Sequence, residues 1–388
     1  MTSSSNASTE TARMAVNSSG SIRRITTSST TGMGRLCQAD GEGAAGFPND
    51  DPGGIDRHPT DSVGTVHRSI VAVVAIVLVA TAACTGLEPL TETTSEVIAF
   101  ESVDLPGRLW DPFMPPLTDG PTVMVEGRLT VPPTEEPVPV VIITHGCSGI
   151  GSGSGWEDEL SDAGFATFEI DSFGGRGVTE ICSGRETLNV LSPVVDVYRA
   201  ADLLDDHPYI DASRIAVLGF SFGGRSSIWS GFTRFQEAYG GRAFAGHLAF
   251  YPSTCFIELA DEDLAGVPFR IFHGTEDDWT PIDQCQTMVD RLVAEGEDAV
   301  IHAYQGAAHA FDNVGLAWSV SHFHPDGVSP AECTFVEEDG AIIDTGTGSV
   351  AGVGSTCVRR GVTYAYDADA RRAAASDLIA DLTAMFGP

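Results

Sequence analysis

Residues 214–224 read RIAVLGFSFGG, an apolar strand-like run that leads into a serine between glycines. A helical pattern follows at 223–232, so Ser221 is expected at a sharp turn from a strand into a helix. Glycine is needed beside such a turn because a Cβ atom would collide with the backbone. The first N–H groups of the helix would point at a group bound to the serine. We therefore predict that Ser221 is a nucleophile, rather than the cap of an ordinary glycine turn.

Similar apolar runs recur along the chain and alternate with helical patterns. Residues 139–144 read PVVIIT, as expected of a strand buried on both faces, whereas 122–131 alternate apolar and polar residues as in an exposed antiparallel strand. The pattern predicts strands at 122–131, 139–144, 165–170, 214–218, 244–250, 268–272 and 299–304, and helices at 156–163, 190–206, 223–232, 282–295 and 368–386. This order predicts an α/β fold with a mostly parallel central sheet and helices on both faces.

The residues that directly follow these strands carry groups suited to nucleophilic catalysis. Ligands collect at the carboxyl ends of parallel strands. His309 follows the 299–304 strand and is the candidate base for Ser221, since a serine hydroxyl attacks only after losing its proton. Asp277 follows the 268–272 strand and is the candidate acid that orients the histidine, with Asp278 as the alternative. His302 falls within its strand and is expected to face away from the site.

Other residues near the strand ends are candidates for binding roles. The backbone N–H groups of Phe222 and Cys147 are the expected donors to an oxyanion. Cys147 as a thiolate nucleophile is the competing interpretation, but its segment lacks the strand–turn–helix pattern. His145, Arg176 and Trp279 are candidates for substrate contacts. Arg176 could grip a substrate carboxylate or form a structural ion pair with a nearby acid.

From about residue 139 to its end, the chain resembles the dienelactone hydrolase family. The similar motifs are DSFGGRGV at 171–178, DDWTP at 277–281 and VTYAYD at 362–367, together with Tyr251-Pro252. The resemblance implies an α/β-hydrolase fold without a large cap domain, acting on carboxylic esters or lactones. The order Ser221, Asp277, His309 is the one expected of that fold.

The chain departs from this family at two motif positions and in one segment. It has Ser221 where founding members have a cysteine nucleophile, and His145-Gly146 where they have a glutamate. Both departures favour a general serine esterase. Residues 312–360 form a long loop-like insertion before the last helix, which we expect to act as a partial lid. Trp318 and Phe323 are its candidate apolar lining.

Composition restricts partners and cofactors. Lys and Arg number 21 against 54 Asp and Glu, and all the cations are Arg. A net charge of −33 disfavours nucleic acid as a partner, and the absence of Lys excludes lysine-based catalysis. The sequence holds no metal-ligand cluster or nucleotide fingerprint, so neither a metal nor another cofactor is expected.

The N-terminal part reads as a leader. Residues 1–65 are rich in Ser, Thr and Gly and are expected to be disordered. Residues 66–84 hold a short apolar run and end in Ala-Ala-Cys84, which predicts a signal peptide, a lipoprotein signal or an uncleaved anchor. The hydrolase domain is expected at 97–388, outside the cytoplasm, either secreted or attached to a membrane through this segment or a lipidated Cys84.

Cysteines beyond the leader agree with export. Six of the eight cysteines follow residue 97, an even number as a disulfide framework requires. Pairs Cys333–Cys357 and Cys255–Cys285 are the expected ones. The sequence therefore predicts an exported serine hydrolase of small esters or lactones. A peptidase or acyltransferase on the same fold, and a non-catalytic cell-surface binding protein, are the alternatives.

Overall fold

The computed structural model describes residues 13–16, 22–25, 87–107, 118–150, 155–184, 188–264, 266–317 and 321–387. The chain divides into two compact units, Met1–Cys84 and Thr85–Pro388. In the first unit, β1 (Arg13–Val16) and β2 (Ile22–Ile25) form an antiparallel pair. The rest of the predicted disordered segment and the predicted export signal, with Cys84, lie outside the described residues. None of the helices in the described part of the chain combines the length and hydropathy needed to cross a bilayer.

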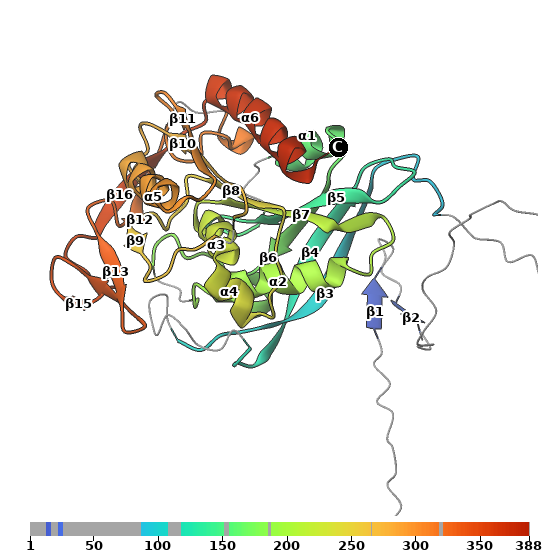
Figure 1. Ribbon diagram of the computed structural model, residues 1–388, viewed down its shortest axis with the longest axis horizontal. Coiled ribbons are helices and arrows are strands. Elements are labelled where there is room, and N and C mark those ends of the chain that lie inside the picture. Colours follow the sequence, from blue (N-terminus) through green and yellow to red (C-terminus); the bar gives the residue numbers. More distant parts are fainter. Residues whose placement is uncertain are drawn as a thin grey trace, which may run out of the picture. The chain divides into compact units, whose positions relative to one another are not determined.

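An eight-stranded sheet forms the centre of the second unit (Figure 1). Its order is β11-β10-β8-β7-β5-β6-β4-β3, and the pairs from β11 to β6 are all parallel. The strands are β3 (Thr94–Val103), β4 (Thr122–Val131), β5 (Val138–Thr144), β6 (Ala166–Asp171), β7 (Ile210–Phe220), β8 (Gly246–Phe250), β10 (Phe269–Gly274) and β11 (Ala299–Tyr304). Strand β4 runs antiparallel to both of its neighbours. The predicted α/β fold with a mostly parallel sheet is confirmed.

Helices cover both faces of this sheet. They are α1 (Trp156–Asp162), α2 (Ser192–Leu204), α3 (Phe222–Gly231), α4 (Thr233–Ala238), α5 (Ile282–Glu295) and α6 (Ala368–Phe386). Alternate residues of β5 serve the two faces, as the period of a strand requires. Val140 and Ile142 pack in the core that holds α2, α3 and α5, and Val141 and Ile143 pack in the core that holds α1 and α6. Figure 1 shows α1 and α6 together on one side of the sheet.

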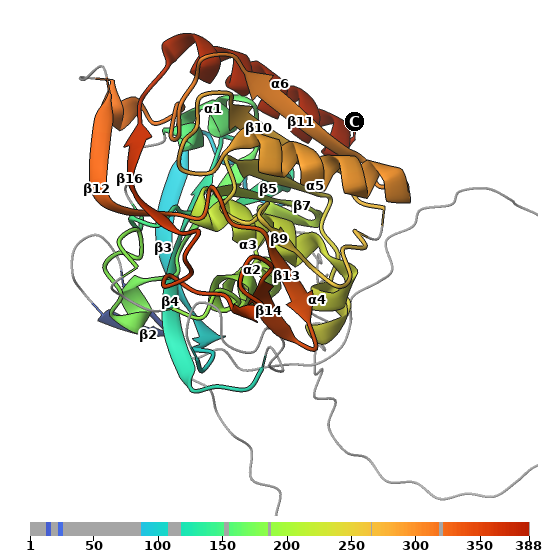
Figure 2. The ribbon, with the colours of Figure 1, turned by 90° about the vertical axis from the view of Figure 1, so that its left-hand side faces the viewer.

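The insertion at 312–360 is not the loop expected from the sequence. It contains the 3₁₀ helix η2 (Val314–Leu316) and strands β12 (His322–Ser329), β13 (Phe335–Glu338), β14 (Ala341–Asp344) and β15 (Ser349–Val350), and reaches β16 (Arg359–Tyr364). Strands β12 and β16 pair with each other, and β13–β15 form a small sheet with β9 (Ile257–Glu258). Apart from the eight-residue β12, these strands are short, and all of them lie outside the main sheet (Figure 2), so they need no long apolar run.

Three disulfides link consecutive cysteines of the second unit. Cys255 pairs with Cys285 and Cys333 with Cys357, as predicted. The third bridge joins Cys147, in the loop after β5, to Cys182. That bridge removes the thiolate interpretation of Cys147, since a disulfide sulfur has no free thiol to ionise.

Glu169, on β6, gives a pH-dependent test of how this strand is buried in the central sheet. Burial, reinforced by Glu157, raises the pKa of Glu169 to about 7 despite Arg128 on the neighbouring strand. The folded state thus holds the Glu169 proton more tightly than the unfolded state does. Ionisation of Glu169 therefore lowers the free energy of unfolding as pH rises from about 4.5 to 7. We expect the Tm of Glu169→Gln, minus that of the wild type, to rise across this window and then level off. A Tm difference that is constant with pH would contradict this. Glu126→Gln is the matched control, because Glu126 is exposed on β4.

Candidate active site

Ser221 lies at a strained turn between β7 and α3. Its φ of 52° and ψ of −108° are rare for a residue with a side chain. The turn depends on missing side chains: a Cβ on Gly219 would lie 2.1 Å from the Gly223 carbonyl oxygen, and one on Gly223 would lie 2.2 Å from the Thr144 oxygen. The Ser221 N–H donates to Phe250 O at 2.9 Å, which ties the turn to β8. The turn expected from RIAVLGFSFGG is therefore present.

His309 joins Ser221 to an acid. Its Nε2 lies 3.0 Å from Ser221 Oγ, and its Nδ1 lies 2.7 Å from Asp277 Oδ2. Because ionised Asp277 can only accept, Nδ1 donates to it and Nε2 is left to accept from the serine hydroxyl. The three side chains come from the ends of β7, β10 and β11, neighbouring regions of one sheet edge. The predicted nucleophile, base and acid are thus within hydrogen-bonding reach.

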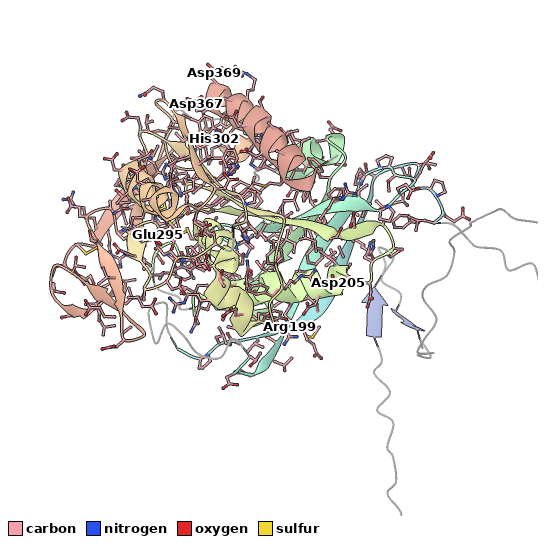
Figure 3. The ribbon with its side chains drawn as sticks, viewed as in Figure 1. Arg199, Asp205, Glu295, His302, Asp367 and Asp369 are labelled. Atoms are coloured by element: carbon pink, nitrogen blue, oxygen red, sulfur yellow. A yellow bond between two sulfur atoms is a disulfide. The ribbon has the colours of Figure 1, made fainter. Side chains whose placement is uncertain are left out.

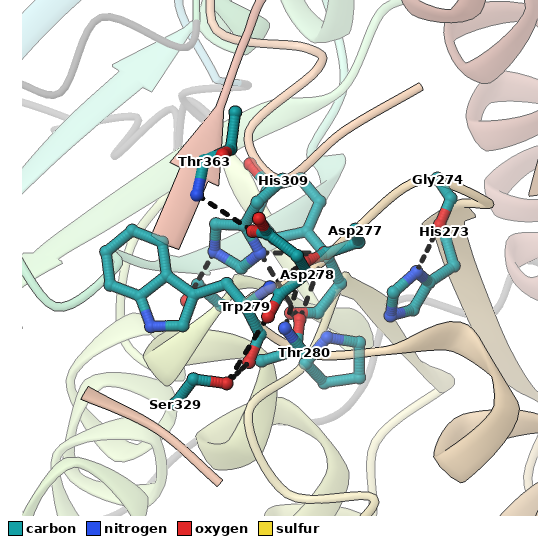
Figure 4. A network of polar contacts seen from close by, with 12 residues as sticks. His273, Gly274, Asp277, Asp278, Trp279, Thr280, His309, Ser329 and Thr363 are labelled. Carbon is teal, nitrogen blue, oxygen red and sulfur yellow. Dashed lines mark hydrogen bonds and ion pairs between the residues drawn. The ribbon is translucent and has the colours of Figure 1, made fainter. Parts of the chain in front are cut away.

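Asp277 is the carboxylate in this chain of contacts, and Asp278 is not (Figure 4). Asp277 Oδ1 accepts from the backbone N–H groups of Trp279 and Thr280 at 2.8 and 2.9 Å. Although burial opposes ionisation, the imidazole of His309 and these donors hold the pKa of Asp277 below its ordinary value. Asp278 instead accepts from the Thr363 N–H of β16 at 2.8 Å. The geometry therefore separates two acids that the sequence left as alternatives.

Two aromatic rings flank the imidazole of His309. The ring of Tyr251 lies 4.5 Å away and that of Trp279 4.8 Å away, between centroids. The Tyr251 hydroxyl donates to Asp312 Oδ1 at 2.5 Å, and Trp156 donates to the other carboxylate oxygen at 2.7 Å. Asp312 is fully buried, so its hydrogen bonds to Tyr251 and Trp156 hold the Tyr251 ring against the imidazole of His309.

Thr280 and Tyr251 are site residues that the sequence did not single out for a role. Thr280 Oγ1 lies 3.1 Å from Asp277 Oδ2 and 3.2 Å from both His309 Nδ1 and the Tyr251 carbonyl oxygen. A usable signal was present, because Thr280 is three residues after Asp277 and Tyr251 directly follows β8. His302 behaves as predicted: its Nε2 lies 2.9 Å from Asp381 of α6, and Figure 3 shows it beside that helix.

The loop after β5 runs beside the nucleophile. A Cβ placed on Gly146 would lie 3.8 Å from the Ser221 Cβ. Cys147, the next residue, lines the same pocket as Ser221 and Phe222. The bridge to Cys182 and the Ile181 N–H, which donates to the Cys147 carbonyl at 2.9 Å, hold this loop in place. Gly146 thus lies beside the serine, and Cys147 follows it in a loop that lines the same pocket.

A pocket opens beside Ser221 and has about 650 Å³ of empty space, part of it open to solvent. Trp279, predicted to contact substrate, is in its lining. Phe323, predicted to line the lid, is 66% exposed on β12 and is not among the lining residues. Trp318, the other predicted lining residue, is outside the described part of the chain.

His145 and Arg176 are placed in the scaffold and not in the pocket lining, which corrects the expectation that they contact substrate. His145 is buried; its Nδ1 donates to the Gly146 carbonyl at 2.8 Å and its Nε2 accepts from the Ser172 N–H at 3.2 Å. Burial lowers the pKa of His145, which suits this neutral, bridging tautomer. Arg176 makes two 2.8 Å bonds to the fully buried carboxylate of Asp196, the structural alternative stated for it.

Because Arg176 pairs with Asp196, we expect its substitution to lower the free energy of unfolding without weakening substrate binding. Arg176→Met leaves Asp196 as a buried carboxylate without a countercharge, which costs about 3–5 kcal/mol in the free energy of unfolding. We expect denaturant titration to show this loss, and the double variant Arg176→Met/Asp196→Leu to recover most of it. An increased KM for anionic esters with unchanged stability would instead return Arg176 to substrate binding.

Comparisons with known proteins identify a family that this chain matches. A model of the dienelactone hydrolase family matches residues 125–321, which include Ser221, Asp277 and His309. A curated relative from Ajellomyces capsulatus, described as "Probable dipeptidyl-aminopeptidase B", is 25% identical over 221 residues. That match spans 46% of this chain but 23% of the relative, so the chain corresponds to about a quarter of that protein.

Two solved structures are also similar to this chain. A dienelactone hydrolase-like promiscuous phosphotriesterase from metagenomic libraries is 16% identical, with a TM-score of 0.47, over 76% of this chain and 99% of its own. The esterase Est1E from Butyrivibrio proteoclasticus is 15% identical, with a TM-score of 0.37, over 49% of this chain and 87% of its own.

Proposed function

The chain belongs to the dienelactone hydrolase family, and we propose that it is a serine hydrolase that cleaves carboxylic esters or lactones through an acyl-enzyme. The observation that carries this proposal is the contact chain Ser221 Oγ, His309 Nε2, His309 Nδ1 and Asp277 Oδ2, at 3.0 and 2.7 Å. Such a chain lets a neutral serine become a nucleophile at the moment of attack.

The first half-reaction transfers the acyl group to the protein. Ser221 Oγ forms a bond to the ester carbonyl carbon while His309 Nε2 takes the hydroxyl proton. Ionised Asp277 stabilises the imidazolium through Nδ1. His309 then returns the proton to the leaving alkoxide oxygen as the ester C–O bond breaks. A water molecule, deprotonated by the same imidazole, releases the acid in the second half-reaction.

The negative charge on the tetrahedral oxygen needs donors that are already in place. The proposed donors are the backbone N–H groups of Phe222, at the start of α3, and of Cys147, in the loop after β5. One donor of this kind is worth about 10²–10³ in turnover. The bridge of Cys147 to Cys182 supports this role, since it fixes the loop that carries one of the two donors.

A peptidase on the same fold is the second candidate, because a curated relative is described as a dipeptidyl-aminopeptidase. Side-by-side assays of p-nitrophenyl acetate, a simple lactone and a dipeptidyl p-nitroanilide separate the two activities. We expect hydrolysis of the ester or the lactone and little of the anilide. Preferential cleavage of the anilide would replace the esterase proposal by the peptidase.

Extracytoplasmic location is proposed for the mature protein, either secreted or attached to a membrane. The three disulfides support this, because such bridges persist in oxidising compartments. Fractionation of cells that express the full chain tests it, with Cys84→Ala as the comparison for lipidation. Recovery in the cytoplasm with all thiols reduced would contradict the proposal.

A further inference from the structure

The outer wall of the pocket comes from a part of the chain beyond the family match. That match ends at residue 321. The later residues in the lining are Val328, Pro330, Phe335, Gly352, Val353 and Val358. The side chains that face a substrate bound at Ser221 are therefore supplied in part by a segment that the family motifs do not describe.

Hydrogen bonds dock this wall onto the loops of the active site. Trp279 Nε1 donates to the Val328 carbonyl at 2.9 Å, and the Val328 N–H donates to the Cys182 carbonyl at 3.0 Å. Ser329 Oγ donates to the Trp279 carbonyl at 2.8 Å. The disulfide Cys333–Cys357 links the two ends of residues 333–357, which hold much of this wall. A wall that is hydrogen-bonded to these loops at residues 328–329 and closed by a disulfide has a defined shape, which is what selection between substrates requires.

The chemistry of the wall is apolar. Its lining side chains are valines, a proline and Phe335, whose ring packs against Phe256, also in the lining, at 5.7 Å. Arg225 is the lining cation, but it is 3% exposed and its Nε and Nη2 donate to the carbonyl oxygen of Ser253. An uncharged apolar group would be stabilised here, whereas a charged group would lose hydration against aliphatic surface.

Val353 packs directly against Gly184, and both residues line this pocket. A Cβ placed on Gly184 would lie 3.2 Å from Val353 Cγ1 and 3.3 Å from Val328 Cγ2. Val353 is 43% exposed, so it lies where the pocket meets solvent, whereas Phe335 is fully buried. The side chain at position 353 thus borders the pocket at a solvent-exposed position.

We propose that the 322–358 segment binds an uncharged apolar substituent of the ester, and that Val353 limits the length of that substituent. This inference rests on the proposed esterase function. The substituent can be the acyl chain or the alcohol chain, since both meet at the carbonyl carbon. Two substrate series separate them: p-nitrophenyl esters from acetate to decanoate, and acetates of alcohols of increasing length.

Val353→Ala and Val353→Phe should change the length profile in opposite directions. We expect kcat/KM for the long member of one series, relative to acetate, to rise about tenfold in the alanine variant and to fall about tenfold in the phenylalanine variant, as for pocket changes of a few methylene groups. Val350→Ala, on β15, is the matched control, because Val350 is 62% exposed and not in the lining.

Labelling with fluorophosphonates that carry short or long alkyl chains gives a second readout at Ser221. Unchanged length ratios in both variants, with acetate still hydrolysed and Ser221 still labelled, would overturn the inference while leaving the proposed function intact. A preference of the wild type for anionic esters would overturn it too. If neither hydrolysis nor labelling occurs in the folded wild type, the proposed function fails and the inference fails with it.

Discussion

Ser221→Ala should abolish ester hydrolysis, lowering kcat by about 10⁶-fold and leaving only the residual catalysis of the binding site. The alanine has no oxygen to form the acyl-enzyme, so His309 has no hydroxyl proton to accept and Asp277 has no imidazolium to stabilise. The turn itself should survive, because its shape is set by Gly219 and Gly223 and by the backbone bond to β8. We expect an unchanged Tm and no labelling by a fluorophosphonate probe.

Ser213→Ala is the matched control for this variant. Ser213 lies on the same strand, β7, but is exposed at its other end, and its hydroxyl donates to Asp211. It should retain wild-type turnover and labelling. Ester hydrolysis that persists in a purified, folded Ser221→Ala protein would remove this serine from the mechanism. A wild type that is folded but neither labelled nor active would favour the non-catalytic binding protein.

Asp277→Asn should lower kcat by about 10⁴-fold with little change in KM. The amide would present a donor where His309 Nδ1 now donates, so the histidine would adopt the tautomer that cannot accept the Ser221 proton. Two backbone N–H groups, of Trp279 and Thr280, already occupy the other oxygen. They favour an orientation of the amide that turns its NH₂ group toward His309.

Asp278→Asn tests whether the effect belongs to this carboxylate alone. Asp278 is the adjacent acid, but it contacts the Thr363 N–H of β16 and not the imidazole. We expect its variant to keep kcat within a fewfold of the wild type, measured on p-nitrophenyl acetate across pH. A larger loss in Asp278→Asn than in Asp277→Asn would reverse the assignment of the acid.

The middle of the sheet was predictable because β5, β8 and the second half of β7 are buried on both faces. Residues 139–143 have no polar side chain that could face solvent, and the alternation of such runs with helical patterns leaves few topologies other than parallel crossovers. The nucleophile turn was predictable for a related reason. Only glycine tolerates the close approaches beside Ser221, so the turn shows directly in the sequence.

The insertion was predicted, but its strands were missed although one clear signal was present. Asp339 and Gly340 join β13 to β14 with φ values of 48° and 76°. Both values are positive, as in the two-residue hairpin turns that favour Asp-Gly. The strands beside this turn are four residues each, too short for their alternation to stand out from loop sequence.

The roles of His145 and Arg176 could not be read from their positions. A residue that follows a strand is known to lie at the sheet edge, but the direction of its side chain depends on partners elsewhere. Arg176 pairs with Asp196 on α2, which lies twenty residues away in sequence. In the sequence, Asp196 looks like part of the solvent-exposed acidic face of a helix. For Thr280 the spacing from Asp277 was a signal, but its contacts depend on where the side chains of Asp277 and His309 meet.

The order of the disulfides has a consequence for biosynthesis. Within the second unit, each bridge joins a cysteine to the next one along the chain, with separations of 35, 30 and 24 residues and no crossing. Short loops close at low entropic cost. A polypeptide that is threaded N-terminus first into an oxidising compartment can therefore complete each native link before the next thiol arrives. We expect maturation to need little help from a disulfide isomerase.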